Sequence, residues 1–150
     1  MLDYSMDLKT DRLSPEEVLN LISTLDVELA NRLSRVVDLE EYSRKLSANA
    51  RFIIGYADTN IVGLLAFYEN SDKNELYVPY VCTSHQYRRR GFAHLLMSSL
   101  INYADTTERS ITLEVLDTNS PAISFYRKMG FETIGAKGDK FIMKRFPVIK

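Results

Sequence analysis

The sequence predicts an α+β fold built on a mixed, mostly antiparallel sheet of about six or seven strands. Three observations lead to this class. Apolar residues recur every three or four positions in the first third of the chain, which is typical of amphipathic helices. Three β-rich segments with short polar loops between them then indicate a meander. A long helical stretch, a strand, a second helical stretch and a hairpin complete the pattern.

The first third of the chain is expected to be mainly helical. Residues 1–12 are polar and form either a first strand or an irregular start. Ser14-Pro15-Glu16-Glu17 predicts a helix start, because serine can cap, proline suits the first helical position and Glu17 completes a capping box. Further helical stretches are expected over 27–33 and after Asp38, to about Ala48.

The middle of the chain predicts three consecutive strands. Residues 52–57 and 61–68 form a hairpin around the turn 58–60, and residues 76–83 follow as a third strand. Pro79 lies inside this third strand. Because proline cannot donate to a ladder, it indicates either a bulge with an unpaired side or an ordinary edge strand.

The last third predicts two helices, a core strand and a closing hairpin. A helix opens at Gly91, and the alternating segment 110–116 is a core strand. Asn119 or Ser120 caps the next helix, and Gly130 is placed as its left-handed terminator. The remaining segments, 131–136 and 140–146, form the hairpin.

Length and composition narrow the classes of function. A chain of 150 residues fits one domain over 1–150, and a net charge of −1 offers no general attraction for nucleic acid. The single Cys82 excludes an internal disulfide and a cysteine-rich zinc site. No stretch has the length and apolar character of a membrane span, and no export signal is visible at the N-terminus. A cytoplasmic protein without metal is therefore expected.

The most informative stretch joins the third strand to the long helix through Arg88-Arg89-Arg90-Gly91. A helix N-terminus presents unpaired backbone amides and a partial positive charge. Glycine has no side chain to keep an anion away from them, and arginines can pair with phosphate oxygens. The turn therefore predicts a phosphate site, with a merely solvated basic turn as the alternative.

Two motifs in this region resemble a known family. Arg88-x-x-Gly91-x-Ala93 is similar to the Arg/Gln-x-x-Gly-x-Gly/Ala signature of the GNAT superfamily of acyl-CoA N-acyltransferases. About 30 residues later, the segment 119–131 resembles the Asn-x-x-Ala-x-x-x-Tyr-x-x-x-Gly-Phe element of that family. The resemblance covers residues 76–146. It implies helices on both faces of the sheet and a splayed, bulged strand at the cofactor cleft.

The resemblance also implies roles for residues. Acetyl-CoA is the expected co-substrate, with its diphosphate on the turn and its pantetheine arm along the third strand. The implied cofactor residues are Val81, Cys82, Thr83, Arg88, Arg89, Arg90, Gly91, Phe92, Ala93, Asn119, Ala122 and Tyr126.

Two residues are expected to act in catalysis. Tyr126 matches the position of a general acid for the leaving thiolate, and its alternative role is a partly buried helix aromatic. Glu75 is the candidate general base. Other base candidates near the strand ends are Tyr80, His85, Glu114 and Asp117. Cys82 is not expected to be a nucleophile, because no histidine or acid follows it in a known order.

The predicted function is acetyl-CoA-dependent N-acetyl transfer to a primary amine by direct attack in a ternary complex. The expected acceptor is a small molecule such as an amino sugar, with a protein or peptide amine as the alternative. A second alternative is an acyl-CoA-binding or regulatory module that has lost catalysis. The expected assembly is a monomer or a homodimer that binds neither nucleic acid nor membrane.

Overall fold

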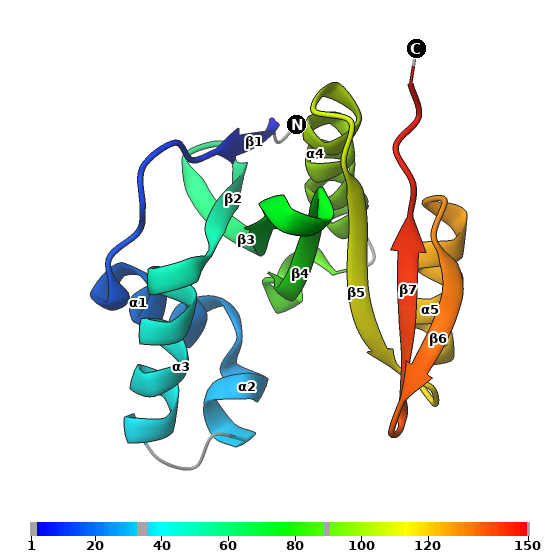
Figure 1. Ribbon diagram of the computed structural model, residues 1–150. Helices are drawn as coiled ribbons and strands as arrows, with labels where there is room; N and C mark the ends of the chain where they lie inside the picture. Colours follow the sequence, from blue (N-terminus) through cyan, green and yellow to red (C-terminus); the bar gives the residue numbers. More distant parts are fainter. Residues whose placement is uncertain (1–2, 33–35, 89–90, 150) are drawn as a thin grey trace. The chain divides into compact units, whose positions relative to one another are not determined.

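The computed structural model describes residues 3–32, 36–88 and 91–149. Its strands form one mixed sheet in the order β1-β2-β3-β4-β5-β7-β6, which confirms the predicted α+β class (Figure 1). The elements are β1 (Tyr4–Leu8), α1 (Pro15–Leu25), α2 (Val27–Arg32), α3 (Val36–Asn49), β2 (Arg51–Ala57), β3 (Asn60–Asn70), β4 (Glu75–Thr83), α4 (Phe92–Thr106), β5 (Ser110–Leu116), α5 (Ser120–Lys128), β6 (Glu132–Lys137) and β7 (Lys140–Arg145). Two short 3-10 helices, η1 (Ser71–Lys73) and η2 (His85–Tyr87), flank β4.

The contacts divide the chain into two compact units. The first comprises Met1–Phe67 and Tyr80–Ser99, and the second comprises Tyr68–Pro79 and Leu100–Lys150. The expectation of a single domain over 1–150 stays a prediction. In the part of the chain that the structure describes, no helix is both long and apolar enough to span a membrane.

The first unit contains α1, α2 and α3 with the strands of the predicted hairpin. β1 pairs antiparallel with β2 from Tyr4↔Ala57 to Leu8↔Ile53, so the polar start of the chain is a strand. β2 pairs with β3 as predicted, with a register shift between Gly55 and Tyr56. Residue 33, the expected end of the second helical stretch, lies outside the described residues. α3 begins at Val36, whereas the sequence predicted a helix that starts after Asp38.

The start of α1 confirms the predicted capping box. The Glu17 amide donates to Ser14 Oγ at 3.1 Å, and the Ser14 amide donates to Glu17 Oε1 at 3.0 Å. We expect Ser14→Ala to lower the free energy of unfolding by about 1 kcal/mol, because the Glu17 amide at the helix end loses its side-chain acceptor. Chemical denaturation measures this change. Ser98→Ala, inside α4, is the control, and an equal loss in both variants would contradict the capping role.

The second unit contains β5, α5 and the closing hairpin. β5 pairs antiparallel with β7 from Ile111↔Arg145 to Leu116↔Lys140, and β7 pairs with β6 as predicted. Asn119, one of the two predicted caps, accepts the Ala122 amide at 3.3 Å. Gly130 follows the end of α5 with φ +98°, the left-handed conformation expected of a terminator.

Pro79 does not mark an edge strand, because β4 is the fourth of seven strands in the sheet. β4 pairs in parallel with β5 over Glu75↔Ser110, Leu76↔Ile111 and Tyr77↔Thr112. The ladder therefore stops before Pro79, which cannot donate to it. This agrees with the other interpretation, a strand with an unpaired side, and corrects the edge-strand alternative.

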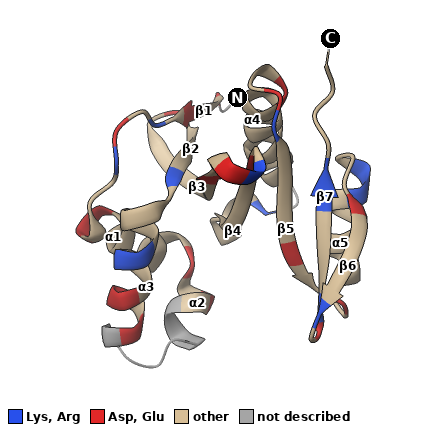
Figure 2. Cartoon of the chain, in the orientation of Figure 1, with Lys and Arg blue, Asp and Glu red and all other residues tan. Residues whose placement is uncertain are grey.

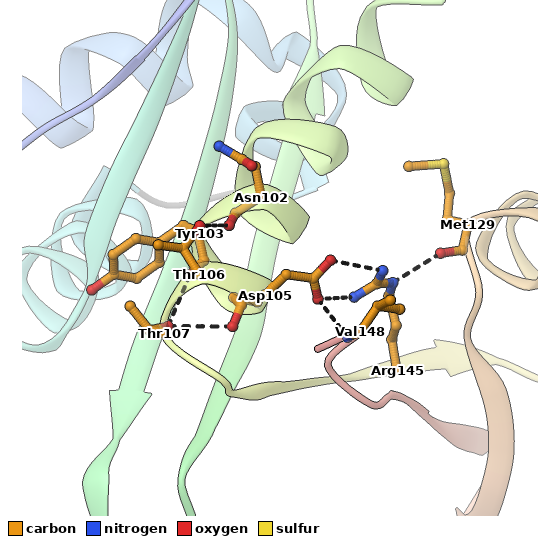
Figure 3. A network of polar contacts seen from close by, with 9 residues as sticks. Asn102, Tyr103, Asp105, Thr106, Thr107, Met129, Arg145 and Val148 are labelled. Atoms are coloured by element: carbon orange, nitrogen blue, oxygen red, sulfur yellow. Dashed lines mark hydrogen bonds and ion pairs between the residues drawn. The ribbon is translucent and has the colours of Figure 1, made fainter. Parts of the chain in front are cut away.

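An ion pair that the sequence did not reveal ties the C-terminal strand to α4 within the second unit (Figure 3). Arg145 donates to both carboxylate oxygens of Asp105, at 2.8 and 3.2 Å, and to the Met129 carbonyl at 3.2 Å. The Val148 amide donates to the same carboxylate at 3.0 Å. The bidentate geometry fixes the end of β7 against α4 and the end of α5.

Candidate active site

A cavity of about 340 Å³ in the first unit brings together three segments that the motif predicted to bind cofactor. These are the end of β4, the turn after it and the first turn of α4. The cavity is lined by Val81, Cys82, Thr83, Arg88 and Ala93, together with Asp26 and Glu28 from the corner between α1 and α2. Five predicted cofactor residues therefore share one cavity wall, and two acidic residues that sequence reasoning missed complete it.

The turn before α4 has the backbone conformation that its glycine predicts. Gly91 has φ +77°, and a Cβ added there would meet no atom within 4 Å. Its carbonyl accepts the Leu95 amide at 3.2 Å, which starts the helical ladder. The amides of Gly91, Phe92 and Ala93 donate to no other described residue. Open space and available donors suit an anion. Arg89 and Arg90, also predicted to bind cofactor, lie outside the described residues.

The Arg88 side chain joins the turn to two other elements. Its Nε donates to the Thr83 carbonyl at 3.2 Å, and one terminal nitrogen donates to Glu28 at 2.7 Å. The hydrogen bond to Glu28 raises the pKa of the Arg88 guanidinium. Its charge is thus already partnered by an acid.

The Phe92 side chain belongs to the core. It is 1% exposed, and its ring meets the edges of Tyr4 and Tyr87 at centroid distances of 5.2 and 6.2 Å. A Cβ added to Gly55 or Gly63 would lie 2.4 or 2.6 Å from Phe92 Cε1. Because these two glycines have no side chains, the Phe92 ring can pack against them at the start of α4. Only the Phe92 backbone remains for a ligand.

We expect Gly63→Ala to lower the free energy of unfolding by about 1–3 kcal/mol, because the new methyl group would clash with the Phe92 ring. Cofactor affinity should fall as well, since the ring fixes the first turn of α4. Thermal unfolding and ligand titration measure the two effects. Adding Phe92→Leu to this variant should restore part of both losses.

Gly135→Ala on β6 is the matched control for this prediction. The nearest atom to its added Cβ is Ile142 Cδ1 at 3.9 Å, an ordinary contact. If both alanine variants lost equal stability, or if Phe92→Leu restored nothing, steric conflict at Phe92 would not be the cause.

Burial keeps two β4 side chains neutral. It raises the pKa of the Cys82 thiol to about 11, so this sulfur is protonated near neutral pH. Burial also raises the pKa of the Tyr80 hydroxyl, which donates to Asp26 Oδ2 at 2.8 Å. Neither group is thus poised as nucleophile or base, which agrees with the expectation for Cys82 and disfavours Tyr80 as the base.

The predicted acid, Tyr126, lies on α5 in the second unit. Its ring is half-buried between Phe125 and Phe131, at centroid distances of 5.3 and 5.6 Å. Burial raises the pKa of its hydroxyl. No other described residue hydrogen-bonds to this hydroxyl. The hydroxyl is therefore protonated and available as a donor. On the same helix, Asn119 caps through Ala122, so the predicted capping role holds.

The candidate bases are distributed over both units. Glu75 opens β4 opposite Ser110 in the second unit, where Glu114 accepts the Tyr77 hydroxyl at 3.1 Å. Asp117 is exposed after β5 in that unit, and His85 lies in η2 of the first unit. Among the described residues, no three His, Cys, Asp or Glu side chains are placed to hold a metal ion together.

The end of β4, the glycine turn and the start of α4 thus lie together, as the two motifs predicted. The model of the acetyltransferase (GNAT) family matches residues 17–131, and the chain belongs to this family. This confirms the resemblance seen in the two motifs and extends it toward the N-terminus.

Individual relatives support the same class. The chain is 36% identical over 66 residues to the L-amino acid N-acetyltransferase AaaT of Escherichia coli. The aligned segment covers 43% of this chain and 40% of that protein. It is 28% identical over 121 residues to the probable N-acetyltransferase san of Drosophila melanogaster, 75% of this chain and 66% of that protein. It spans between 32% and 66% of the length of the curated relatives that it matches.

A solved structure has the same fold. The PaiA N-acetyltransferase of Thermoplasma acidophilum, determined in complex with coenzyme A, superposes with a TM-score of 0.70 at 18% identity. The match covers 95% of this chain and 99% of that protein.

Proposed function

We propose that this chain is an acetyl-CoA-dependent N-acetyltransferase that acetylates the primary amine of a small molecule by direct attack in a ternary complex. The observation that carries this proposal is the cavity beside Gly91, where the end of β4, Arg88 and the start of α4 meet. The match to the acetyltransferase (GNAT) family over residues 17–131 supports it.

The diphosphate of acetyl-CoA is assigned to the amides of Gly91, Phe92 and Ala93. A helix N-terminus favours an anion, and the glycine leaves open space for one. Arg89 and Arg90 supply further charge in this proposal. Arg88 positions the turn through its bonds to Thr83 and Glu28 and contributes charge to the same place.

The pantetheine arm is assigned to the backbone of Val81, Cys82 and Thr83, as an added strand. The β4–β5 ladder covers Glu75 to Tyr77 and does not include these residues. Asn119 and Ala122 at the start of α5 complete the cofactor contacts in this proposal.

In the reaction, the amine nitrogen forms a bond to the thioester carbonyl carbon and the carbon–sulfur bond breaks. Tyr126 donates its phenolic proton to the departing thiolate, and the proton that the amine loses goes to Glu75, directly or through water. Burial keeps the Tyr126 hydroxyl protonated at neutral pH, as this role requires. An N–H of β4 near Val81 is assigned to the thioester oxygen.

The acceptor is assigned to the small primary amines, with an amino sugar as one example. The relative AaaT, named for L-amino acids, supports a small acceptor. A protein or peptide amine is the alternative acceptor, and an acyl-CoA-binding module without catalysis is the alternative function. The binding and turnover measurements described next distinguish these alternatives from the proposal.

The test combines binding with turnover. Calorimetry measures acetyl-CoA affinity, and thiol release measures turnover with glucosamine, an L-amino acid and a short peptide with a free N-terminus. Binding with turnover of the small amines supports the proposal. Turnover of the peptide alone would show that the acceptor is a protein or peptide amine. Acetyl-CoA binding without any turnover would favour an acyl-CoA-binding module that lacks catalysis. Sedimentation of the same sample distinguishes a monomer from the homodimer.

A further inference from the structure

The corner between α1 and α2 holds a carboxylate in a fixed position. Asp26 ends α1, where its amide donates to the Ile22 carbonyl at 2.8 Å. One carboxylate oxygen accepts the Leu29 amide at 3.0 Å, and the other accepts the Tyr80 hydroxyl at 2.8 Å. Tyr80 is buried and meets the Tyr42 ring edge-on at 6.1 Å. The carboxylate is therefore held from two elements, α2 and β4.

This carboxylate lines the cavity beside Val81, Cys82 and Thr83, the strand segment assigned to the acyl-CoA arm. Acidic residues occur in the first turn of α1, α2 and α3 (Figure 2). Within the described ranges, no lysine or arginine forms a salt bridge with Asp26, since Arg88 pairs with Glu28 instead. The cavity wall therefore carries two carboxylates, Asp26 and Glu28, and one described guanidinium, Arg88. Arg88 pairs with Glu28 and acts on Asp26 only through longer-range electrostatic attraction, so Asp26 is left without a salt bridge to a described residue.

The sign of this charge identifies the kind of group that it suits. A carboxylate repels phosphate and attracts a cation, so Asp26 is unsuited to the cofactor's phosphates. A primary alkylamine, with a pKa near that of lysine at about 10, is protonated at neutral pH. A carboxylate offers about four lone-pair sites, of which Leu29 and Tyr80 use two. The remaining two can accept N–H bonds from an ammonium group.

We propose that Asp26 anchors the ammonium group of the acceptor and that Tyr80 holds the carboxylate in place for this purpose. The proposal rests on the proposed function and deepens it, because it selects acceptors that arrive as cations. Asp26 is a specificity residue here: it binds the protonated amine beside β4. The amine proton then leaves to the base or to water before nitrogen attacks the thioester.

The test compares Asp26→Asn with wild type on two acceptors near neutral pH: butylamine, which is cationic, and aniline, which is uncharged. Removing the charge should raise the KM for butylamine by about 10- to 100-fold, the effect of losing about 1.4–2.7 kcal/mol of attraction. The kcat/KM for aniline should change by less than about two-fold, as should the affinity for acetyl-CoA, because neither binds through this charge.

Three further variants separate charge from structure. Glu16→Gln removes an exposed carboxylate from the first turn of α1 and should change nothing, although its net charge matches that of Asp26→Asn. Asp26→Glu keeps the charge and should recover part of the butylamine affinity. Tyr80→Phe keeps the carboxylate but removes the hydroxyl that orients it, so the KM for butylamine should rise by about three-fold, less than when the charge itself is removed.

A binding measurement makes the result independent of turnover. Butylamine binding to wild type and Asp26→Asn is followed by NMR line broadening in the presence of coenzyme A. Equal butylamine affinity in the two proteins, or an equal loss for aniline, would overturn the anchor. If wild type binds acetyl-CoA and acetylates no amine, the proposed function fails, while this comparison still decides the role of Asp26.

Discussion

Replacing Gly91 by aspartate should lower the affinity for acetyl-CoA by about 100-fold or more. The added carboxylate would stand among the amides of Gly91, Phe92 and Ala93, where the proposal puts the diphosphate. Two like charges about 4 Å apart repel by about 4 kcal/mol near a protein surface. Solvent screening reduces this figure, because the position is exposed. Calorimetric titration of acetyl-CoA measures the loss.

The fold should survive this change, because the site has room. A Cβ at Gly91 meets no atom within 4 Å, although φ is +77°. Gly91→Asn is the control for backbone strain, since asparagine and aspartate both tolerate this conformation. The asparagine variant should keep most of the affinity, so that the difference between the two reports charge alone.

Gly138→Asp is the control for charge at a strained position. Gly138 lies in the turn between β6 and β7 with φ +60°, and its added Cβ also meets nothing within 4 Å. The Gly138→Asp substitution should leave the affinity for acetyl-CoA unchanged. Equal acetyl-CoA affinities for Gly91→Asp and Gly91→Asn would contradict the assignment of the diphosphate to this turn.

Replacing Tyr126 by phenylalanine should lower kcat by about 100-fold, within the range expected for loss of a general acid. The change removes one hydroxyl that hydrogen-bonds to no other described residue. The ring contacts with Phe125 and Phe131 remain, so stability and acetyl-CoA affinity should change little. Steady-state kinetics and calorimetry together measure this split, and wild-type turnover would exclude the acid role.

Tyr103→Phe is the matched control for the loss of a hydroxyl. The Tyr103 hydroxyl donates to Glu69 at 2.8 Å, so its removal should lower stability and leave kcat unchanged. If both variants lost the same fraction of turnover, the effect of Tyr126→Phe would be structural.

The pH profile offers a second check on Tyr126. Burial raises the pKa of its hydroxyl above the ordinary 10.0, so the acid keeps its proton below that pH. Turnover should therefore rise with pH as the amine loses its proton and should not fall until the pH exceeds about 10. A decline of kcat between pH 7 and 9 would assign the proton donor to another group.

Sequence patterns predicted correctly those features that depend on neighbours along the chain. The capping box of Ser14 and Glu17, the Asn119 cap and the left-handed Gly130 all depend on residues within four positions, and all are observed. The two hairpins are also local, and both formed as predicted. The glycine turn at Gly91 is equally local, because one glycine and one helix start form it, and its role in binding phosphate stays a prediction.

The environment of that turn could not be predicted in the same way. Arg88 pairs with Glu28, 60 positions away, and Asp26 reaches Tyr80, 54 positions away. In the sequence, Asp26 is only a polar residue between two helical stretches. Phe92 occupies one position of a helical stripe, and no pattern in the neighbouring sequence indicates that its ring packs against Gly55 and Gly63.

The sequence by itself determined the class of fold, the glycine turn and the family motifs, because each rests on periodicity or on short fixed spacings. The tertiary structure decided which groups are charged, buried or free at that turn. It placed β4 inside the sheet, buried Cys82 and Tyr80, and brought Asp26 to the cavity. The physical reason is that burial and electrostatic pairing depend on atoms close in space, and spacing along the chain does not encode those distances.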